Sequence, residues 1–93
     1  MDFDVFFPTS FDSIGDPTND NVDVCVTTAD GESYTLVFIT PDNLKSLMES
    51  DHEDFISPSF KYIVVKRIDE STIRRALDEI VCDTALLSYY GKD

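Results

Sequence analysis

Hydrophobic residues recur with two different periods along the chain, and the changes of period divide it into strands and helices. Val22–Thr28 alternates apolar and polar side chains, as a strand with one buried face does. Tyr34–Ile39 is an uncharged run of apolar and β-branched residues, which predicts a central strand covered on both faces. The dipeptide Asp30-Gly31 between them favours a tight turn. We therefore predict an antiparallel β-hairpin.

The period becomes helical directly after the second strand. Thr40 can accept a backbone N–H bond as N-cap, and Pro41 suits the first helical position because the N–H it lacks would have no partner there. This predicts a helix from Pro41 to about Ser50. Its inward-facing residues should be Leu44, Leu47 and Met48.

An acidic loop, a third strand and a second helix follow. Asp51–Asp54 forms the loop, and Phe55-Ile56 should pack back onto the core. Phe60–Ile68 is the third predicted strand. Asp69 is the N-cap of a helix that breaks near Asp83-Thr84. Its apolar stripe, the most regular in the chain, is Ile73, Ala76, Leu77, Ile80 and Val81.

These segments predict one α+β domain over residues 1–93. It is a small three- to four-stranded sheet, a β-hairpin followed by a β-α-β crossover, with two helices packed on one face. The short crossover favours a parallel third strand beside the second. An antiparallel place beside the first strand stays open. Residues 1–21 form an N-terminal strand or a loop that Phe11 and Ile14 hold to the core.

Charge changes the functional picture. The chain has 19 acidic residues against seven Lys and Arg, a net charge of −12. Thirteen of the acids and a single base lie in residues 1–59. Such a field repels nucleic acid and anionic membranes and attracts basic partners. Solubility alone would need a much smaller net charge.

Candidate chemistry is sparse. Cys25 and Cys82 lack metal-ligand spacing and are expected to be buried, reduced thiols. His52, the single histidine, lies in a run of acids, where a solvated loop is the better interpretation than a metal site. We expect no enzymatic activity, no metal and no cofactor. Without an apolar run of membrane-spanning length or a signal-peptide pattern, a cytoplasmic monomer is expected.

Three motifs within Val22–Val81 resemble a known family. They are Ile39–Leu44 (I-T-P-D-N-L), Ile63–Arg67 (I-V-V-K-R), and Asp69 followed by Ile73 and Leu77. This order resembles small immunity proteins that accompany bacterial polymorphic toxins, including contact-dependent growth inhibition systems, and is most similar to the immunity protein 8 type. Where many such proteins carry Trp, two residues after the Pro, this chain has Asn43.

The resemblance implies a tight, stoichiometric inhibitor of a cognate toxin domain, often a nuclease. A basic nuclease cleft that binds phosphates can instead accept carboxylates. The expected partner-binding residues are Asp20, Asp23, Asp30 and Glu32 at one end of the hairpin, Asp51, Glu53 and Asp54 in the loop, and Tyr89 and Tyr90 as anchors. Two alternatives stay open: a DNA-mimic inhibitor of a restriction or defence nuclease, and an acidic adaptor domain with no toxin partner.

Overall fold

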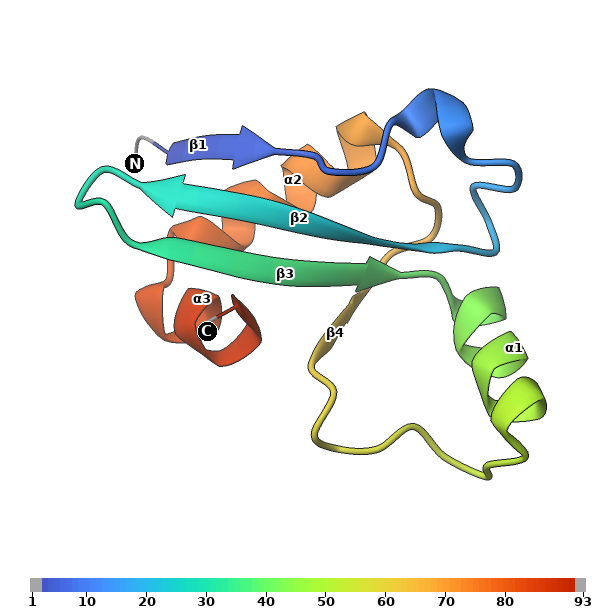
Figure 1. The fold of residues 1–93 in the computed structure, drawn as a ribbon. Helices are drawn as coiled ribbons and strands as arrows, with labels where there is room; N and C mark the ends of the chain where they lie inside the picture. The colour runs from blue at the N-terminus through green and yellow to red at the C-terminus, as the bar shows by residue number, and fades with distance from the viewer. Residues whose placement is uncertain (1–2, 92–93) are drawn as a thin grey trace.

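The computed structural model describes residues 3–91 as an α+β fold with a mixed four-stranded sheet, in the order β1-β2-β3-β4 (Figure 1). The elements are β1 (Phe3–Phe6), the 3₁₀ turn η1 (Phe11–Ser13), β2 (Asn21–Thr28), β3 (Ser33–Ile39), α1 (Pro41–Asp51), β4 (Tyr62–Val64), α2 (Glu70–Val81) and α3 (Thr84–Gly91). The predicted fold class is therefore confirmed.

The sheet follows one of the two predicted topologies. β1 and β3 pair antiparallel with β2, and β4 pairs parallel with β3. The alternative prediction, in which the third predicted strand lies antiparallel beside the first, is therefore wrong. β4 is shorter than the predicted Phe60–Ile68 because it meets only the last three residues of β3, Val37–Ile39. The N-terminal segment supplies the edge strand β1, and Phe11 and Ile14 after it pack against the core.

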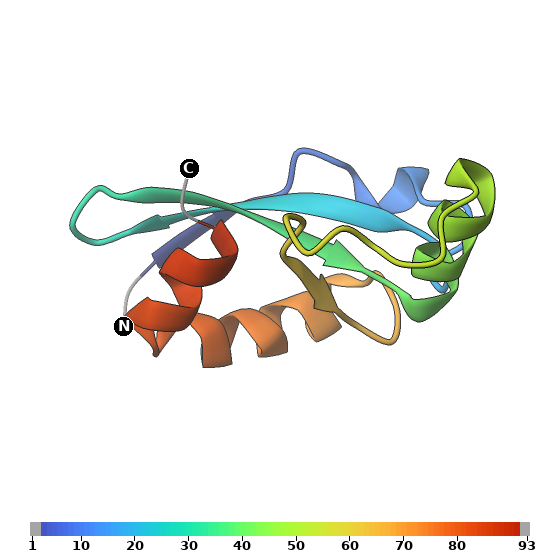
Figure 2. The ribbon, with the colours of Figure 1, turned by 90° about the horizontal axis from the view of Figure 1, so that it is seen from below.

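Two helices, α2 and α3, lie on one face of the sheet (Figure 2). Val22, Val24 and Val26 of β2 and Leu36 and Phe38 of β3 are buried on that face. The predicted stripe of α2 meets them, with Ile73, Leu77, Ile80 and Val81 buried. Burial of a side chain such as Phe38 contributes about 1.5–3 kcal/mol. This layer is the core.

The other face of the sheet is open. In the described part of the chain no helix lies on it (Figure 2), and Val37 and Cys25 are only half-buried there. The prediction that Tyr34–Ile39 is covered on both faces is therefore wrong. The reason is the position of α1, which lies beyond the end of β3 and not over the sheet (Figure 1).

Polar contacts, more than burial, hold α1 in place. Leu44, Leu47 and Met48 are half-buried, so the predicted inward face of α1 reaches the core only in part. The buried Thr40 is the N-cap, as predicted, and its hydroxyl accepts hydrogen bonds from the N–H groups of Asn43 (3.3 Å) and Asp20 (3.2 Å).

Amide side chains continue this attachment. The side-chain amide of Asn43 donates to Asn19 Oδ1 (3.1 Å), and its Oδ1 accepts from the amide of Asn21 (2.7 Å). The start of β2 is thus bonded to the first turn of α1.

Helix α3 approaches the sheet closely at its last residue. A Cβ atom on Gly91 would lie 2.5 Å from Leu36 Cδ2 and 3.0 Å from Tyr34 Cβ. Only glycine allows this distance, so Gly91 fixes how near α3 comes to β3.

The two cysteines, one ion pair of α2 and the length of the helices complete the description of the fold. Cys25 is half-buried and Cys82 exposed, so neither thiol is fully buried, and both are free. On the exposed side of α2, Arg74 pairs with Glu70 (2.7 Å), one turn before it. Within residues 3–91, no helix has the length and apolar character needed to cross a membrane.

Candidate protein-binding surface

The acidic residues of the hairpin lie at two ends of the sheet. Asp30 and Glu32 flank the turn between β2 and β3, whereas Asp20 precedes β2 at the opposite end. An eight-residue strand separates these ends by roughly 25 Å. The prediction that these acids form a single anionic end is therefore wrong. Asp23 lies between the ends, exposed on the open face.

Two of these carboxylates have structural roles. Asp30 accepts hydrogen bonds from the Thr28 hydroxyl and from the Glu32 N–H (3.2 Å), which closes the turn around Gly31 (φ +89°). Asp20 is half-buried, and its carboxylate accepts from the Asn21 N–H (2.7 Å). Both carboxylates therefore accept backbone hydrogen bonds within the hairpin region, in addition to contributing negative charge to the surface.

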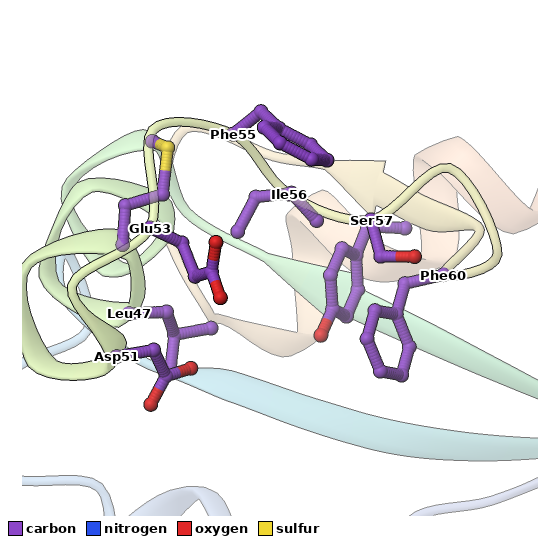
Figure 3. A pocket seen from close by; sticks show the side chains of 9 residues that line it. Leu47, Asp51, Glu53, Phe55, Ile56, Ser57 and Phe60 are labelled. Carbon is purple, nitrogen blue, oxygen red and sulfur yellow. The ribbon is translucent and has the colours of Figure 1, made fainter.

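A groove of about 480 Å³ lies between α1 and the segment that leads into β4 (Figure 3). We call it the crossover groove. Its apolar walls are Leu47 and Met48 from α1, Phe55 and Ile56 from the loop, and Phe60 and Tyr62. Asp51, Glu53 and Ser57 complete its lining.

The loop residues of the crossover groove are more exposed than expected. Phe55 is 63% and Phe60 60% exposed, and Ile56 is half-buried. Phe55-Ile56 therefore does not pack back onto the core. Because α1 ends beyond the sheet, the returning chain passes outside the sheet on its way to β4 (Figure 1).

The end of α1 positions the two carboxylates of the groove. The Glu53 N–H donates to the Met48 carbonyl (2.9 Å) and the His52 N–H to the Glu49 carbonyl (3.4 Å), which is a Schellman closure. His52 takes the left-handed conformation (φ +56°, ψ +39°) that glycine usually supplies there. The closure fixes the backbone of Glu53 two residues after Asp51, and both side chains border the groove.

This helix end is electrostatically unfavourable. The last turn of α1 reads Met-Glu-Ser-Asp, with acids where the negative end of the helix dipole favours Lys or Arg. Glu53 and Asp54 follow within three residues. Asp54 is exposed beside the groove without forming part of its lining.

The crossover groove borders the open face of the sheet. The rings of Phe60 and Tyr62 stack with centroids 5.8 Å apart. Tyr62 is in register with Val37, and Val37 with Asp23. Residues in register point to the same face, so Tyr62, Val37 and Asp23 form a row that leads from the groove across the open face.

The two predicted tyrosine anchors differ. Tyr90 is half-buried and packs against the core. Tyr89 is 55% exposed, meets Tyr90 edge-to-face (5.0 Å) and lies under the Lys61 ammonium, 4.7 Å from the ring centroid. Because Tyr90 packs against the core and Tyr89 is exposed, only Tyr89 is available as an anchor.

The structure thus brings Asp51 and Glu53 together at one groove, and Asp54 lies beside this groove. Asp23 lies at the far end of the row that starts at Tyr62. Asp30 and Glu32 lie at the far end of the hairpin. Sequence reasoning missed the aromatic wall, Phe55, Phe60 and Tyr62. The sequence signal for this wall was two phenylalanines, Phe55 and Phe60, on either side of Pro58 in a loop that is mostly polar.

Two carboxyl groups with a clearly shifted pKa, Asp16 and Asp69, lie outside the crossover groove. Hydrogen bonds from Thr18 lower the pKa of Asp16, and hydrogen bonds from Thr72 lower the pKa of the N-cap Asp69. Over residues 3–91, no three His, Cys, Asp or Glu side chains gather as a metal site would require.

Comparison with known proteins found no matching family model, no matching curated protein and no matching solved structure.

Proposed function

We propose that this protein is a cytoplasmic immunity protein, a monomer without catalytic activity or cofactor that binds and neutralises a cognate toxin domain, a basic nuclease. The observation that carries the proposal is the crossover groove, an exposed aromatic surface bordered by carboxylates on a chain of net charge −12. The proposal takes the toxin class from the resemblance described above.

The surface has the composition of a protein-binding site. Interface hot spots are aromatic side chains at the centre of a contact, surrounded by polar groups that exclude water. Phe55, Phe60 and Tyr62 supply the first feature, and Asp51 and Glu53 the second. The net charge would steer a basic partner and speed its capture, which an inhibitor of a lethal enzyme needs.

The distribution of acids favours an inhibitor of this kind over the two alternatives. A DNA mimic needs carboxylates spaced like phosphates along one face, whereas these acids divide between the ends of the sheet. An adaptor that is acidic only for solubility gives no reason to expose Phe55 and Phe60 beside the acids.

The test is capture and neutralisation of a partner. The tagged protein is used in a pulldown from source cells at about 0.1 M and about 1 M salt, where the Debye length is about 10 Å and about 3 Å. We expect one basic domain, bound stoichiometrically at both salt concentrations. Expression of that domain alone should arrest growth, and co-expression with this protein should restore it.

Two results would contradict the proposal. A mixture of basic proteins that all elute at the higher salt would mean unspecific attraction. A single partner that is not toxic when expressed alone would remove the immunity function, even though the binding is specific.

A further inference from the structure

The crossover groove exposes large aromatic side chains to water. Phe55 and Phe60 each keep about three fifths of their surface in water although Leu47, Met48 and Ile56 lie next to them. The cavity of about 480 Å³ falls within the range of pockets that enclose small ligands, about 300–1,000 Å³. A large side chain from another molecule would remove these rings from water.

The charges around the groove select the kind of occupant. Asp51 stands at the negative end of the α1 dipole, Glu53 follows the Schellman closure, and the last turn offers no cation to either. Asp23 adds a third carboxylate at the end of the row through Val37 and Tyr62. A cation beside these groups would offset both the dipole and the mutual repulsion of the acids.

A second copy of this chain does not meet these requirements. Each copy carries a net charge of −12, and self-association through this surface would bring like charges together. The nearby Lys61 is already placed over the Tyr89 ring. The complementary occupant is a basic segment of a different protein.

We propose that the crossover groove binds a basic segment of the partner in which one aromatic or large aliphatic side chain inserts between α1 and Phe60, while an adjacent Arg or Lys pairs with Asp51 and Glu53. This inference rests on the proposed function for the identity of the partner, but not for the chemistry of the groove. Arg suits the site best because its planar guanidinium can bind a carboxylate through two hydrogen bonds.

The first experiment tests the chemistry with defined probes. The full chain, labelled with ¹⁵N, is titrated with the blocked hexapeptide Arg-Lys-Phe-Leu-Lys-Arg. One control peptide replaces Phe-Leu by Ser-Ser, and another replaces every basic residue by Glu. We expect amide shift changes confined to residues 47–62 with the first peptide, and at least fivefold weaker binding of both controls.

Variants then assign the contacts. Asp51→Asn with Glu53→Gln should weaken the first peptide about tenfold and flatten its salt dependence, whereas Asp30→Asn with Glu32→Gln, the same charge change at the far end, should not. Phe60→Ser should weaken binding of this peptide similarly, whereas Phe6→Ser should not, although Phe6 (65%) is about as exposed as Phe60 (60%). Retained amide dispersion shows that each variant is folded.

Several outcomes would overturn the inference. Equal binding of the Ser-Ser peptide would mean attraction by charge alone, shifts centred on residues 28–33 would place the site at the hairpin turn, and no shifts at residues 47–62 would remove the groove as a site. If the toxin is captured equally well by the groove variants, the inference fails while the proposed function stands. If the peptide fills the groove but no toxin is found, the inference about the groove stands and the proposed function fails.

Discussion

At the scale of single residues, Thr40 joins three elements. Its hydroxyl accepts from the N–H groups of Asp20 and Asn43 and donates to the Asp20 carbonyl (3.3 Å), and its own N–H donates to the same carbonyl (3.2 Å). Thr40 is also fully buried. Water therefore cannot replace these bonds if the hydroxyl is lost.

We expect Thr40→Val to destabilise the protein by about 1–3 kcal/mol because the shape is kept while the N–H groups of two half-buried residues, Asp20 and Asn43, lose their acceptor. Urea unfolding measures the change. The matched control is Thr27→Val, at an exposed strand position, where a change within about 0.5 kcal/mol is expected. Equal effects of the two substitutions would mean that the Thr40 hydroxyl does not hold α1.

His52 presents the opposite case, a residue whose backbone conformation suits another amino acid. It closes α1 at φ +56°, where a Cβ atom is crowded and glycine is not. We expect His52→Gly to stabilise the protein by about 0.5–1 kcal/mol in the same urea assay. Ser50→Gly, two residues earlier within α1, should destabilise it by about 1 kcal/mol. Destabilisation by His52→Gly would show that the imidazole makes a contact of greater value.

At the scale of elements, the approach of α3 to the sheet depends on Gly91. A methyl group there meets Leu36 and Tyr34, and the Leu36 side chain is itself enclosed in the core. We expect Gly91→Ala to destabilise the protein by about 1–3 kcal/mol through this overpacking. Ser88→Ala, on the exposed side of α3, is the control and should change stability little. Chemical denaturation compares the two, and an unchanged Gly91→Ala protein would mean that α3 can shift outward freely.

The elements also show why some of the fold could be predicted and some could not. The stripe of α2 was predictable because its period alone separates Ile73, Leu77 and Ile80 from their charged neighbours. These three positions and Val81 are buried, and Ala76, the fifth residue of the stripe, is half-buried. The uncharged run Tyr34–Ile39 is ambiguous, since a strand between two neighbours in a sheet with one open face gives the same pattern. Its outer residues lie half-buried beside other strands, without a second layer.

The crossover groove was not predictable for a different reason. Phe55 and Phe60 lie in a loop without periodicity, so nothing in the local pattern relates them to each other or to Leu47. They line one groove because α1 points away from the sheet and the chain must return to β4 (Figure 1). That direction is fixed by Thr40 and the amide contacts of Asn43, which are tertiary. The sequence analysis named Asp51 and Glu53 as candidates for partner binding, but not the aromatic side chains that line the groove with them.

At the scale of the whole molecule, the net charge of −12 opposes compactness, and the acids around the end of α1 add to this locally. We expect Asp51→Asn, Glu53→Gln and Asp54→Asn together, which reduce the net charge to −9, to stabilise the free protein by about 1 kcal/mol at low salt. For a domain of this size that raises the Tm by about 4–8 °C. The gain should diminish toward 1 M salt, where charges farther apart than about 3 Å are screened.

The same three substitutions should have the opposite effect on the complex. If a basic partner supplies the cations that the end of α1 lacks, neutralising the acids removes an attraction that exists only in the bound state, and binding weakens as folding strengthens. Lys45→Gln, which makes the free protein more acidic at −13, should lower the Tm slightly and leave the affinity unchanged or higher. Paired thermal unfolding and titration calorimetry separate the two effects. If the three substitutions change neither the stability nor the affinity, these acids belong to a solvated loop whose charge has no role beyond solubility.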